Sequence, residues 1–170
     1  MIEKIQAVIL AGGKGTRLGS LGLKIPKALV KINGKFFLDI IIDQLKKNGI
    51  NDILILAGYK KEQLISNYQN KKKISIIRGG VNWQTLTRIA KARKDIKGKF
   101  FLLMYCDNFL TNFNLKKTLK IRDKTLSNIV FSVVKKKAYQ KGPIIIKKDQ
   151  LIYQNKISSD HTEAGYILIN

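Results

Sequence analysis

The segment "VILAGGKGTRLGSLGLKIPKALVKING", from Val8 to Gly34, decides the fold. It begins within the apolar run "KIQAVILA", which stops at a glycine pair and predicts a short buried β-strand. Three glycines and Arg17 follow directly. Glycine lets backbone N–H groups approach a polyphosphate, and an arginine can donate two hydrogen bonds to phosphate oxygens. The segment therefore indicates either a phosphate-binding loop or an ordinary glycine turn in a lysine-rich chain.

The glycine cluster matches neither of two well-known nucleotide-binding motifs. A P-loop would need Gly-Lys-Ser/Thr at its end, and a G-x-G-x-x-G fingerprint starting at Gly13 would need a glycine where Leu18 stands. Lys27 follows ten residues after Arg17, directly behind the rigid Pro26. A second cation at this place can return to the same phosphates as Arg17, which favours the phosphate-binding interpretation.

Apolar runs alternate with helical patterns along the rest of the chain. "DILILAG", "ISIIRGG", "GKFFLLMYCDN" and "NIVFSVV" are typical of buried strands. Between them, "FFLDIIIDQLKKNGI" predicts a helix that ends at Gly49, and Thr85 and Asn114 are positioned to cap two later helices. The alternation predicts an α/β, Rossmann-like fold with a mostly parallel, mixed sheet and helices on both faces.

We expect one domain over residues 1–170, with a first half at 1–126 and a β-rich second half at 127–170. The second half has shorter strands, including "GPIIIKKDQLIYQ" around a Lys148-Asp149 turn and "GYILIN" at its end. An apolar strand seldom forms the last residues of a chain unless a sheet holds it. The sequence therefore leaves open whether the chain is complete or truncated at its C-terminus.

The charge balance favours anionic partners. Lys and Arg number 33 against 11 Asp and Glu, which gives a net charge of +22. Nucleotides, sugar phosphates, nucleic acid and anionic lipid all fit that charge, but the basic residues are spread as pairs and triplets, which also fits a compositional bias. Aromatic residues make up only 8% and form no stacking platform, so nucleic acid is an unlikely partner.

Composition also bears on location. One cysteine, Cys106, forms no internal disulfide, which favours a reducing compartment. The chain has no apolar run near the ~18 residues that a membrane helix needs, and its N-terminus lacks the layout of a signal peptide. We expect a cytoplasmic protein with no membrane partner.

Ligands of parallel sheets bind beyond the carboxyl ends of the strands. This rule selects the loop after Ala11, the turn after Ala57 and the segment that begins with Cys106 and Asp107. Asp107 is placed either to hold Mg²⁺ or to act as a turn or capping residue. Nothing nearby in the sequence activates Cys106, which we expect to be a small buried residue and not a nucleophile.

With these motifs in place, the sequence resembles the sugar-1-phosphate nucleotidyltransferases (NDP-sugar pyrophosphorylases). Within this family it resembles glucose-1-phosphate cytidylyl- and thymidylyltransferases and heptose-1-phosphate guanylyltransferases. Their pattern is L-A-G-G-x-G-T-R-L, a loop, P-K-P-L/M, a short strand and x-G-K-P. Ala28 and Phe36 replace two prolines of that pattern. The matching segments are 10–18, 26–27 and 34–35.

The resemblance implies transfer of a nucleoside monophosphate from an NTP to a sugar 1-phosphate, giving an NDP-sugar and pyrophosphate for surface polysaccharide biosynthesis. It implies Mg²⁺ as cofactor, held by Asp107, and catalytic roles for Arg17 and Lys27. An assembly of identical subunits is compatible with the family. The nucleotide-binding residues that it implies are Leu10, Ala11, Gly12, Gly13, Gly15, Thr16 and Thr85.

The resemblance is less complete at the base and sugar positions. "TLTR" stands where some cytidylyltransferases have T-G-G-R, so the base stays open, and Arg88 is either a site residue or a solvated helix residue. In the second half, Gly142, Lys156 and Glu163 are implied to bind the sugar phosphate, although Glu163 replaces the usual asparagine. The resemblance also implies a second metal-binding aspartate, in a segment that would follow Asn170.

Three alternatives remain at this point. The chain could be a truncated, inactive paralogue that binds nucleotide or sugar phosphate as a subunit. It could also be a phosphocholine-type cytidylyltransferase, which shares the N-terminal loop, although the sugar-like second half argues against this. A nucleic-acid binder is compatible with the charge alone.

Overall fold

The computed structural model describes residues 4–135, 144–147, 150–153 and 161–170, without the side chains of Arg17, of 144–147 and of 150–153. Predicted site residues Gly142 and Lys156, and the predicted Lys148-Asp149 turn, lie outside the described residues. The elements are, in chain order, β1 (Gln6–Ala11), η1 (Thr16–Leu18), α1 (Ser20–Lys24), η2 (Lys27–Leu29), β2 (Lys31–Ile32), β3 (Lys35–Phe36), α2 (Phe37–Lys47), β4 (Asp52–Ala57), α3 (Lys61–Tyr68), β5 (Ile74–Arg78), α4 (Thr85–Ala92), β6 (Phe101–Tyr105), α5 (Leu115–Thr125), β7 (Ile129–Lys135), β8 (Ile144–Lys147), β9 (Gln150–Tyr153) and β10 (His161–Ile169).

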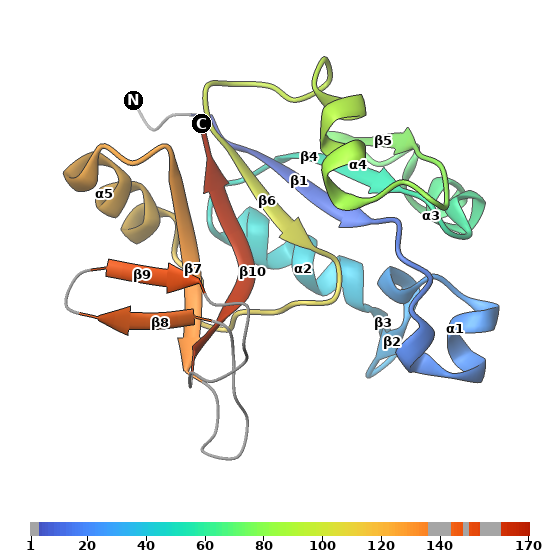
Figure 1. Ribbon diagram of the computed structural model, residues 1–170. Helices are drawn as coiled ribbons and strands as arrows, with labels where there is room; N and C mark the ends of the chain where they lie inside the picture. The colour runs from blue at the N-terminus through green and yellow to red at the C-terminus, as the bar shows by residue number, and fades with distance from the viewer. Residues whose placement is uncertain (1–3, 136–143, 148–149, 154–160) are drawn as a thin grey trace.

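A mixed sheet forms the centre of the molecule (Figure 1). Its strand order is β5-β4-β1-β6-β10-β8-β9, and β7 also pairs with β10. The pairings among β5, β4, β1 and β6 are parallel, whereas every pairing that involves β7, β8, β9 or β10 is antiparallel. The predicted α/β fold is confirmed, with its parallel part in the first half of the chain.

Side chains of β1 alternate between two apolar cores, one on each face of the sheet. Ala7 and Ile9 belong to the core that also contains Leu38 of α2, whereas Val8 belongs to the core that contains Ala92 of α4. Residues of α3 and α5 join the first core. Helices therefore cover both faces of the sheet, as predicted, and β1 is buried throughout.

Two of the three predicted helix ends are confirmed. Gly49 adopts a left-handed φ of 83° just after α2, and the Asn114 side chain accepts a hydrogen bond from the Lys117 backbone N–H at 3.0 Å, capping α5. The predicted cap at Thr85 is wrong. Gln84, in extended conformation, is the N-cap of α4, and Thr85 is already the first helical residue.

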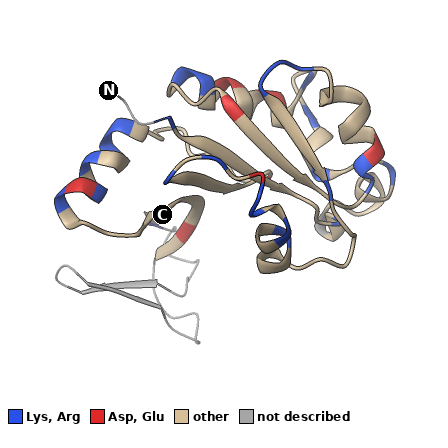
Figure 2. Ribbon diagram, turned by 90° about the horizontal axis from the view of Figure 1, so that it is seen from above, with Lys and Arg blue, Asp and Glu red and all other residues tan. Residues whose placement is uncertain are grey.

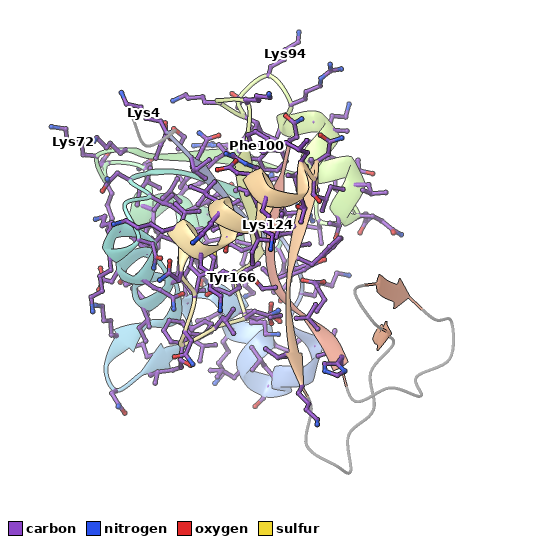
Figure 3. The ribbon with its side chains drawn as sticks, turned by 90° about the vertical axis from the view of Figure 1, so that its left-hand side faces the viewer. Lys4, Lys72, Lys94, Phe100, Lys124 and Tyr166 are labelled. Carbon is purple, nitrogen blue, oxygen red and sulfur yellow. The ribbon has the colours of Figure 1, made fainter. Side chains whose placement is uncertain are left out.

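Lysines and arginines occur on many separate elements, with a dense group along α5 (Figure 2). Figure 3 shows Lys4, Lys72 and Lys94 extending outward from the protein. Their spread matches the distribution along the sequence. Within the part of the chain that the structure describes, no helix has both the length and the apolar character needed to span a bilayer.

Tyr166 joins three parts of the fold from inside the protein (Figure 3). Its hydroxyl donates to Gln44 Oε1 of α2 at 2.7 Å and accepts from the Leu110 backbone N–H at 3.3 Å. Gln44 Nε2 in turn donates to the Leu110 carbonyl at 2.7 Å, and the Tyr166 ring packs against Phe113 with centroids 4.8 Å apart. Strand β10 and helix α2 are thereby linked to the segment that follows β6.

Replacing Tyr166 by phenylalanine tests this link. The Tyr166→Phe variant leaves Gln44 Oε1 and the Leu110 N–H without their partner, and we expect a loss of about 1–3 kcal/mol in the free energy of unfolding. Urea unfolding followed by circular dichroism measures it. Tyr59→Phe is the matched control, since Tyr59 is only half-buried, beside Lys60. Equal stability of the two variants would contradict the proposed link.

Candidate active site

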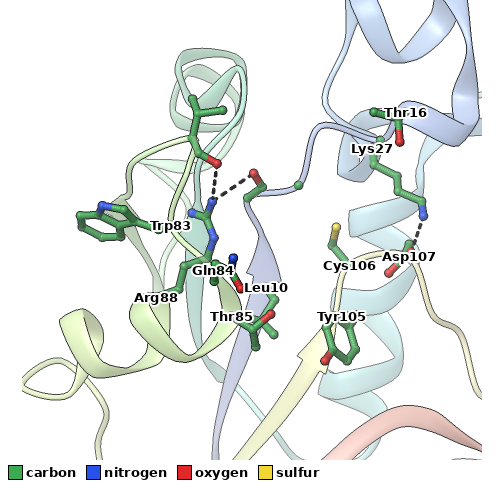
Figure 4. Close-up of a pocket in the computed structure, with 14 residues that line it drawn as sticks. Leu10, Thr16, Lys27, Trp83, Gln84, Thr85, Arg88, Tyr105, Cys106 and Asp107 are labelled. Carbon is green, nitrogen blue, oxygen red and sulfur yellow. Dashed lines mark hydrogen bonds and ion pairs between the residues drawn. The ribbon is translucent and has the colours of Figure 1, made fainter. Parts of the chain in front are cut away.

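Three neighbouring parallel strands end at the same edge of the sheet. Ala11 of β1 lies opposite Ala57 of β4, and Leu10 lies opposite Tyr105 of β6. The loops that follow β1 and β6, together with residues between β5 and α4, line a pocket of about 400 Å³ (Figure 4), whereas the predicted turn after Ala57 does not line it. The pocket thus lies where the sequence predicted it, beyond the carboxyl ends of the strands.

Most of the predicted residues in the first half of the chain line this pocket. Ala11 does not, because its side chain belongs to the core beside β1. The predicted residues found there are Leu10, Gly12, Gly13, Gly15, Thr16, Lys27, Thr85 and Asp107. Cys106, from the segment that the sequence selected, also lines it, and the structure adds residues that the sequence did not predict for the site, namely Val81, Trp83, Gln84 and Tyr105.

The glycine loop depends on two unusual backbone arrangements. Gly15 has a left-handed φ of 64°, which side chains rarely adopt, and it leads directly into η1. A Cβ on Gly22 of α1 would lie 2.6 Å from the Gly15 carbonyl oxygen, so α1 packs tightly against the loop. Gly13, by contrast, is exposed and has open space around it. The loop is thus supported on one side and accessible to a ligand on the other.

Lys27 and Asp107 form an ion pair at one end of the pocket (Figure 4). Lys27 comes from η2 and Asp107 follows β6, and each side chain is about a quarter exposed, at 27% and 26%. A cation and a carboxylate that are distant in sequence therefore meet beside the glycine loop. Lys27 is placed to reach phosphate oxygens, and Asp107 to hold a cation.

Asp107 suits Mg²⁺ only in combination with substrate oxygens. Among the described residues, no group of three His, Cys, Asp or Glu side chains could form a metal site of its own. Mg²⁺ in nucleotide-dependent enzymes is commonly held by one or two carboxylates together with substrate phosphates. A single carboxylate at the edge of a phosphate-sized pocket fits this type of site.

Cys106 is inert at neutral pH. Burial, together with the nearby Asp107 charge, raises the pKa of its thiol to about 12, although Lys27 opposes the shift. The thiol stays protonated, in agreement with its expected role as a small buried residue. Burial also raises the pKa of the neighbouring Tyr105 hydroxyl, and the charges of Glu163 and Asp107 raise it further.

Asn108 ties the end of β6 to strand β10. Its Nδ2 donates to the Ala164 carbonyl at 3.2 Å, and a Cβ on Gly165 would lie 2.1 Å from that nitrogen. Gly165 also has a left-handed φ of 77°. The contact holds Glu163 of β10 close enough for its charge to act on Tyr105 of the pocket.

The Glu163 carboxyl is half-buried and incompletely satisfied. Its Oε1 is buried and has no hydrogen-bond partner among the described residues. Burial raises the pKa of this carboxyl, while a hydrogen bond with the Gly165 backbone lowers it. A buried acceptor of this kind calls for a hydrogen-bond donor beyond the described residues.

Arg88 is buried, with 6% of its surface exposed, and lines the pocket from α4. Its guanidinium donates to backbone carbonyls of the surrounding loops. The interpretation of Arg88 as a solvated helix residue is therefore wrong. The sequence could not show this, because the acceptors are backbone carbonyls, and those of Gly12 and Ala57 are distant from Arg88 in the chain.

Comparison with known proteins finds relatives that are named as cytidylyltransferases. A probable glucose-1-phosphate cytidylyltransferase of Bacillus subtilis is 34% identical over 135 residues, covering 65% of this chain and 53% of the relative. A choline-phosphate cytidylyltransferase of Streptococcus pneumoniae is 51% identical over 59 residues, covering 35% of this chain and 26% of the relative. The matches thus span about half or less of these relatives' length.

The fold itself matches solved structures. HddC from Yersinia pseudotuberculosis, complexed with GMP-PN, has a TM-score of 0.77 and 24% identity, covering 98% of this chain and 76% of that chain. Residues 6–154 match the family described as nucleotidyl transferase. That span includes the glycine loop, Lys27, Asp107 and Arg88. The resemblance seen in the sequence is confirmed at this level, and the chain belongs to the nucleotidyl transferase family.

Proposed function

We propose that this protein transfers a nucleoside monophosphate from an NTP to a sugar 1-phosphate, giving an NDP-sugar and pyrophosphate for surface polysaccharide biosynthesis. The observation that carries this proposal is the meeting of Lys27 and Asp107 beside the glycine loop, at one edge of a parallel sheet. The Bacillus subtilis relative, named as a probable glucose-1-phosphate cytidylyltransferase, supports a sugar phosphate as acceptor.

The reaction needs positioning and charge neutralisation more than proton transfer. An oxygen of the sugar phosphate attacks the α-phosphorus of the NTP and forms a new P–O bond. The bond from the α-phosphorus to the bridging oxygen breaks at the same time, and pyrophosphate leaves. Because the attacking oxygen is already ionised, no general base is required. Lys27 and Arg17 would neutralise the triphosphate and the departing pyrophosphate.

Substrate binding would change the partner of Lys27. In the free protein its ammonium pairs with Asp107. A triphosphate offers Lys27 phosphate oxygens instead, and Asp107 becomes free to hold Mg²⁺. The bound cation supplies charge neutralisation at the phosphates. The ion pair thus keeps both side chains in place until the nucleotide arrives.

Glu163 would contact the part of the acceptor that carries no phosphate. A carboxylate repels a phosphate group, whereas its buried and unsatisfied Oε1 can accept a hydrogen bond from a sugar hydroxyl. Gly142 and Lys156 are proposed to meet the sugar and its phosphate, on the strength of the resemblance alone. The neighbouring Asn108–Ala164 contact links this acceptor side to Asp107.

Phosphocholine is the second candidate acceptor. The Streptococcus pneumoniae relative, named a choline-phosphate cytidylyltransferase, has higher identity over its shorter match. The Glu163 carboxylate would also attract a quaternary ammonium group. Both of these relatives are named as cytidylyltransferases, whereas HddC was solved with GMP-PN, so the base needs a test with every NTP. An inactive paralogue that only binds these ligands is the third outcome.

A panel of NTPs against acceptors tests the proposal. Pyrophosphate release is measured with Mg²⁺ and glucose 1-phosphate, a heptose 1-phosphate or phosphocholine. We expect turnover with one sugar 1-phosphate, and a fall in kcat of roughly 10²–10³-fold in Lys27→Ala and in Asp107→Asn, because each removes a charge that acts on the transferred phosphate. Lys46→Ala, at an exposed position of α2, is the matched control.

The outcomes of this panel separate the candidates. Turnover with phosphocholine alone would replace the sugar by the second acceptor. NTP binding without pyrophosphate release from any pair, in a chain that includes any segment beyond Asn170, would indicate the inactive paralogue. Full activity of Lys27→Ala would contradict the role of the ion pair.

Glu163→Gln tests acceptor recognition separately. Glutamine keeps the shape but its amide is a weaker acceptor than a carboxylate, so we expect the KM for the acceptor to rise about tenfold while the KM for the NTP stays unchanged. Steady-state kinetics with each substrate varied in turn measures the two values. An equal rise of both KM values would show that Glu163 acts on the whole site and not on the acceptor.

The raised pKa of Glu163 gives a second prediction, for stability. The folded state binds this proton more tightly than the unfolded state does, so ionisation costs stability as the pH rises above the unfolded value of about 4.3. Glu163→Gln has no such cost. We expect it to have a higher Tm than the natural protein at pH 7 and an equal Tm near pH 3.5. Glu62→Gln, on the exposed side of α3, is the control, and a lower Tm of Glu163→Gln at pH 7 would contradict the prediction.

A further inference from the structure

The Arg88 side chain connects three loops at the carboxyl ends of the sheet. Its Nη1 donates to the carbonyl of Ala57, at the end of β4, at 3.0 Å. Its Nη2 lies 3.2 Å from the carbonyl of Gly12, after β1, and 2.9 and 3.3 Å from those of Gly80 and Val81, after β5. One guanidinium therefore holds the carboxyl ends of three parallel strands together.

Three glycines leave the space that this guanidinium occupies. A Cβ on Gly12 would lie 2.1 Å from Arg88 Cζ, and one on Gly58 would lie 2.6 Å from Arg88 Nη1. A Cβ on Gly79 would lie 2.8 Å from the same Nη1. Each distance is too short for a real side chain. The absence of a side chain at Gly12 is thus explained by Arg88, before any nucleotide is considered.

Among the described residues, no carboxylate pairs with Arg88, and the acceptors of its hydrogen bonds are backbone carbonyls. Burial lowers the pKa of the guanidinium, yet an arginine stays protonated in proteins at neutral pH. A positive charge therefore lies directly behind the glycine loop.

The bond to Gly12 also sets the direction of the next peptide N–H. The Gly12 carbonyl accepts from both Arg88 Nη2 and the Tyr59 backbone N–H, the latter at 3.1 Å. Because the peptide unit is planar and trans, the N–H of Gly13 points the opposite way, away from the guanidinium. Arg88 and the Lys27–Asp107 pair lie on opposite sides of this loop (Figure 4).

We propose that Arg88 is the positioning residue of the phosphate-binding loop: by holding the Gly12 carbonyl from behind, it presents the Gly13 N–H to the triphosphate. The inference rests on the proposed function for the identity of the ligand. Gly13 is exposed and has open space around it, so its N–H is accessible to a phosphate oxygen. Arg88 itself acts through the loop and needs no contact with the substrate.

Binding of a base-free probe tests this role. We would titrate Mg²⁺–tripolyphosphate, and then each of the four NTPs with Mg²⁺, into the natural protein, Arg88→Ala, Arg88→Lys and the control Arg93→Ala by calorimetry. Arg93 is exposed at the end of the same helix. We expect Arg88→Ala to weaken tripolyphosphate binding at least tenfold, with Arg93→Ala unchanged.

The lysine variant separates positioning from charge. Lysine keeps the positive charge but lacks the planar fork that reaches several carbonyls, so Arg88→Lys should bind as weakly as Arg88→Ala. Amide hydrogen exchange of the 12–16 segment should be faster in both variants and unchanged in Arg93→Ala. Natural affinity and exchange in Arg88→Lys would overturn the inference in favour of charge alone.

Gly12→Ala keeps the inference testable if Arg88→Ala folds poorly, and a double-mutant cycle of the two substitutions adds a further test where both variants fold. In the natural background, Gly12→Ala forces a Cβ into the guanidinium, and we expect a lower Tm and at least tenfold weaker tripolyphosphate binding. In the Arg88→Ala background the same substitution should cost little further in Tm. An undiminished Tm cost there would show that Gly12 is required for another reason, and would overturn the inference.

The inference and the proposed function fail in different ways. If the natural protein binds tripolyphosphate but releases no pyrophosphate from any substrate pair, the enzymatic proposal is disproved. The role of Arg88 is then still tested by the binding measurements on its variants. Normal turnover by Arg88→Ala, with unchanged KM for the NTP, disproves the role of Arg88 and leaves the enzymatic proposal intact.

Discussion

The two parallel ladders of β1 are the constraint on which the site depends. β1 is buried throughout and pairs on one side with β4 and on the other with β6, so that Ala11 faces Ala57 and Leu10 faces Tyr105. Parallel strands end at one edge, and their loops must leave from it together. A one-residue slip of β6 would turn its side chains to the opposite face and move Asp107 away from Lys27.

The strands could be predicted well because burial on both faces leaves a plain sequence signal. The apolar runs around Val8 and Ile55 are continuous, without the alternation of apolar and polar residues that marks a half-exposed strand, and glycine ends the first of them. Helix starts were harder to place. Thr85 is a good capping residue by type, but the extended backbone at Gln84 makes that residue the cap, and the short helix at Ser20–Lys24 has too few residues for a periodic pattern.

The candidate site could be predicted only as separate residues. Lys27 and Asp107 were both selected from the sequence, yet Lys27 was expected to accompany Arg17, and the structure pairs it with Asp107 in the free protein. The sequence left the role of Arg88 open, because its four hydrogen-bond acceptors are backbone carbonyls that no sequence pattern encodes. The net charge was a poor guide to the site: of the many lysines, Lys27 lines the pocket, whereas others are spread over separate elements.

Parallel strands fix where their loops begin, and one backbone hydrogen bond, from the Tyr59 N–H to the Gly12 carbonyl, joins the loops after β4 and β1. A side chain that also reaches the loop after β5 can hold all three at constant spacing, and backbone carbonyls are the acceptors that every loop offers. A guanidinium carries enough donors to serve several loops at once, and glycines at 12, 58 and 79 provide the room it needs. The glycine loop of this protein is thus shaped from two sides: Arg88 fixes its carbonyl from behind, and the N–H groups left in front are available to a phosphate.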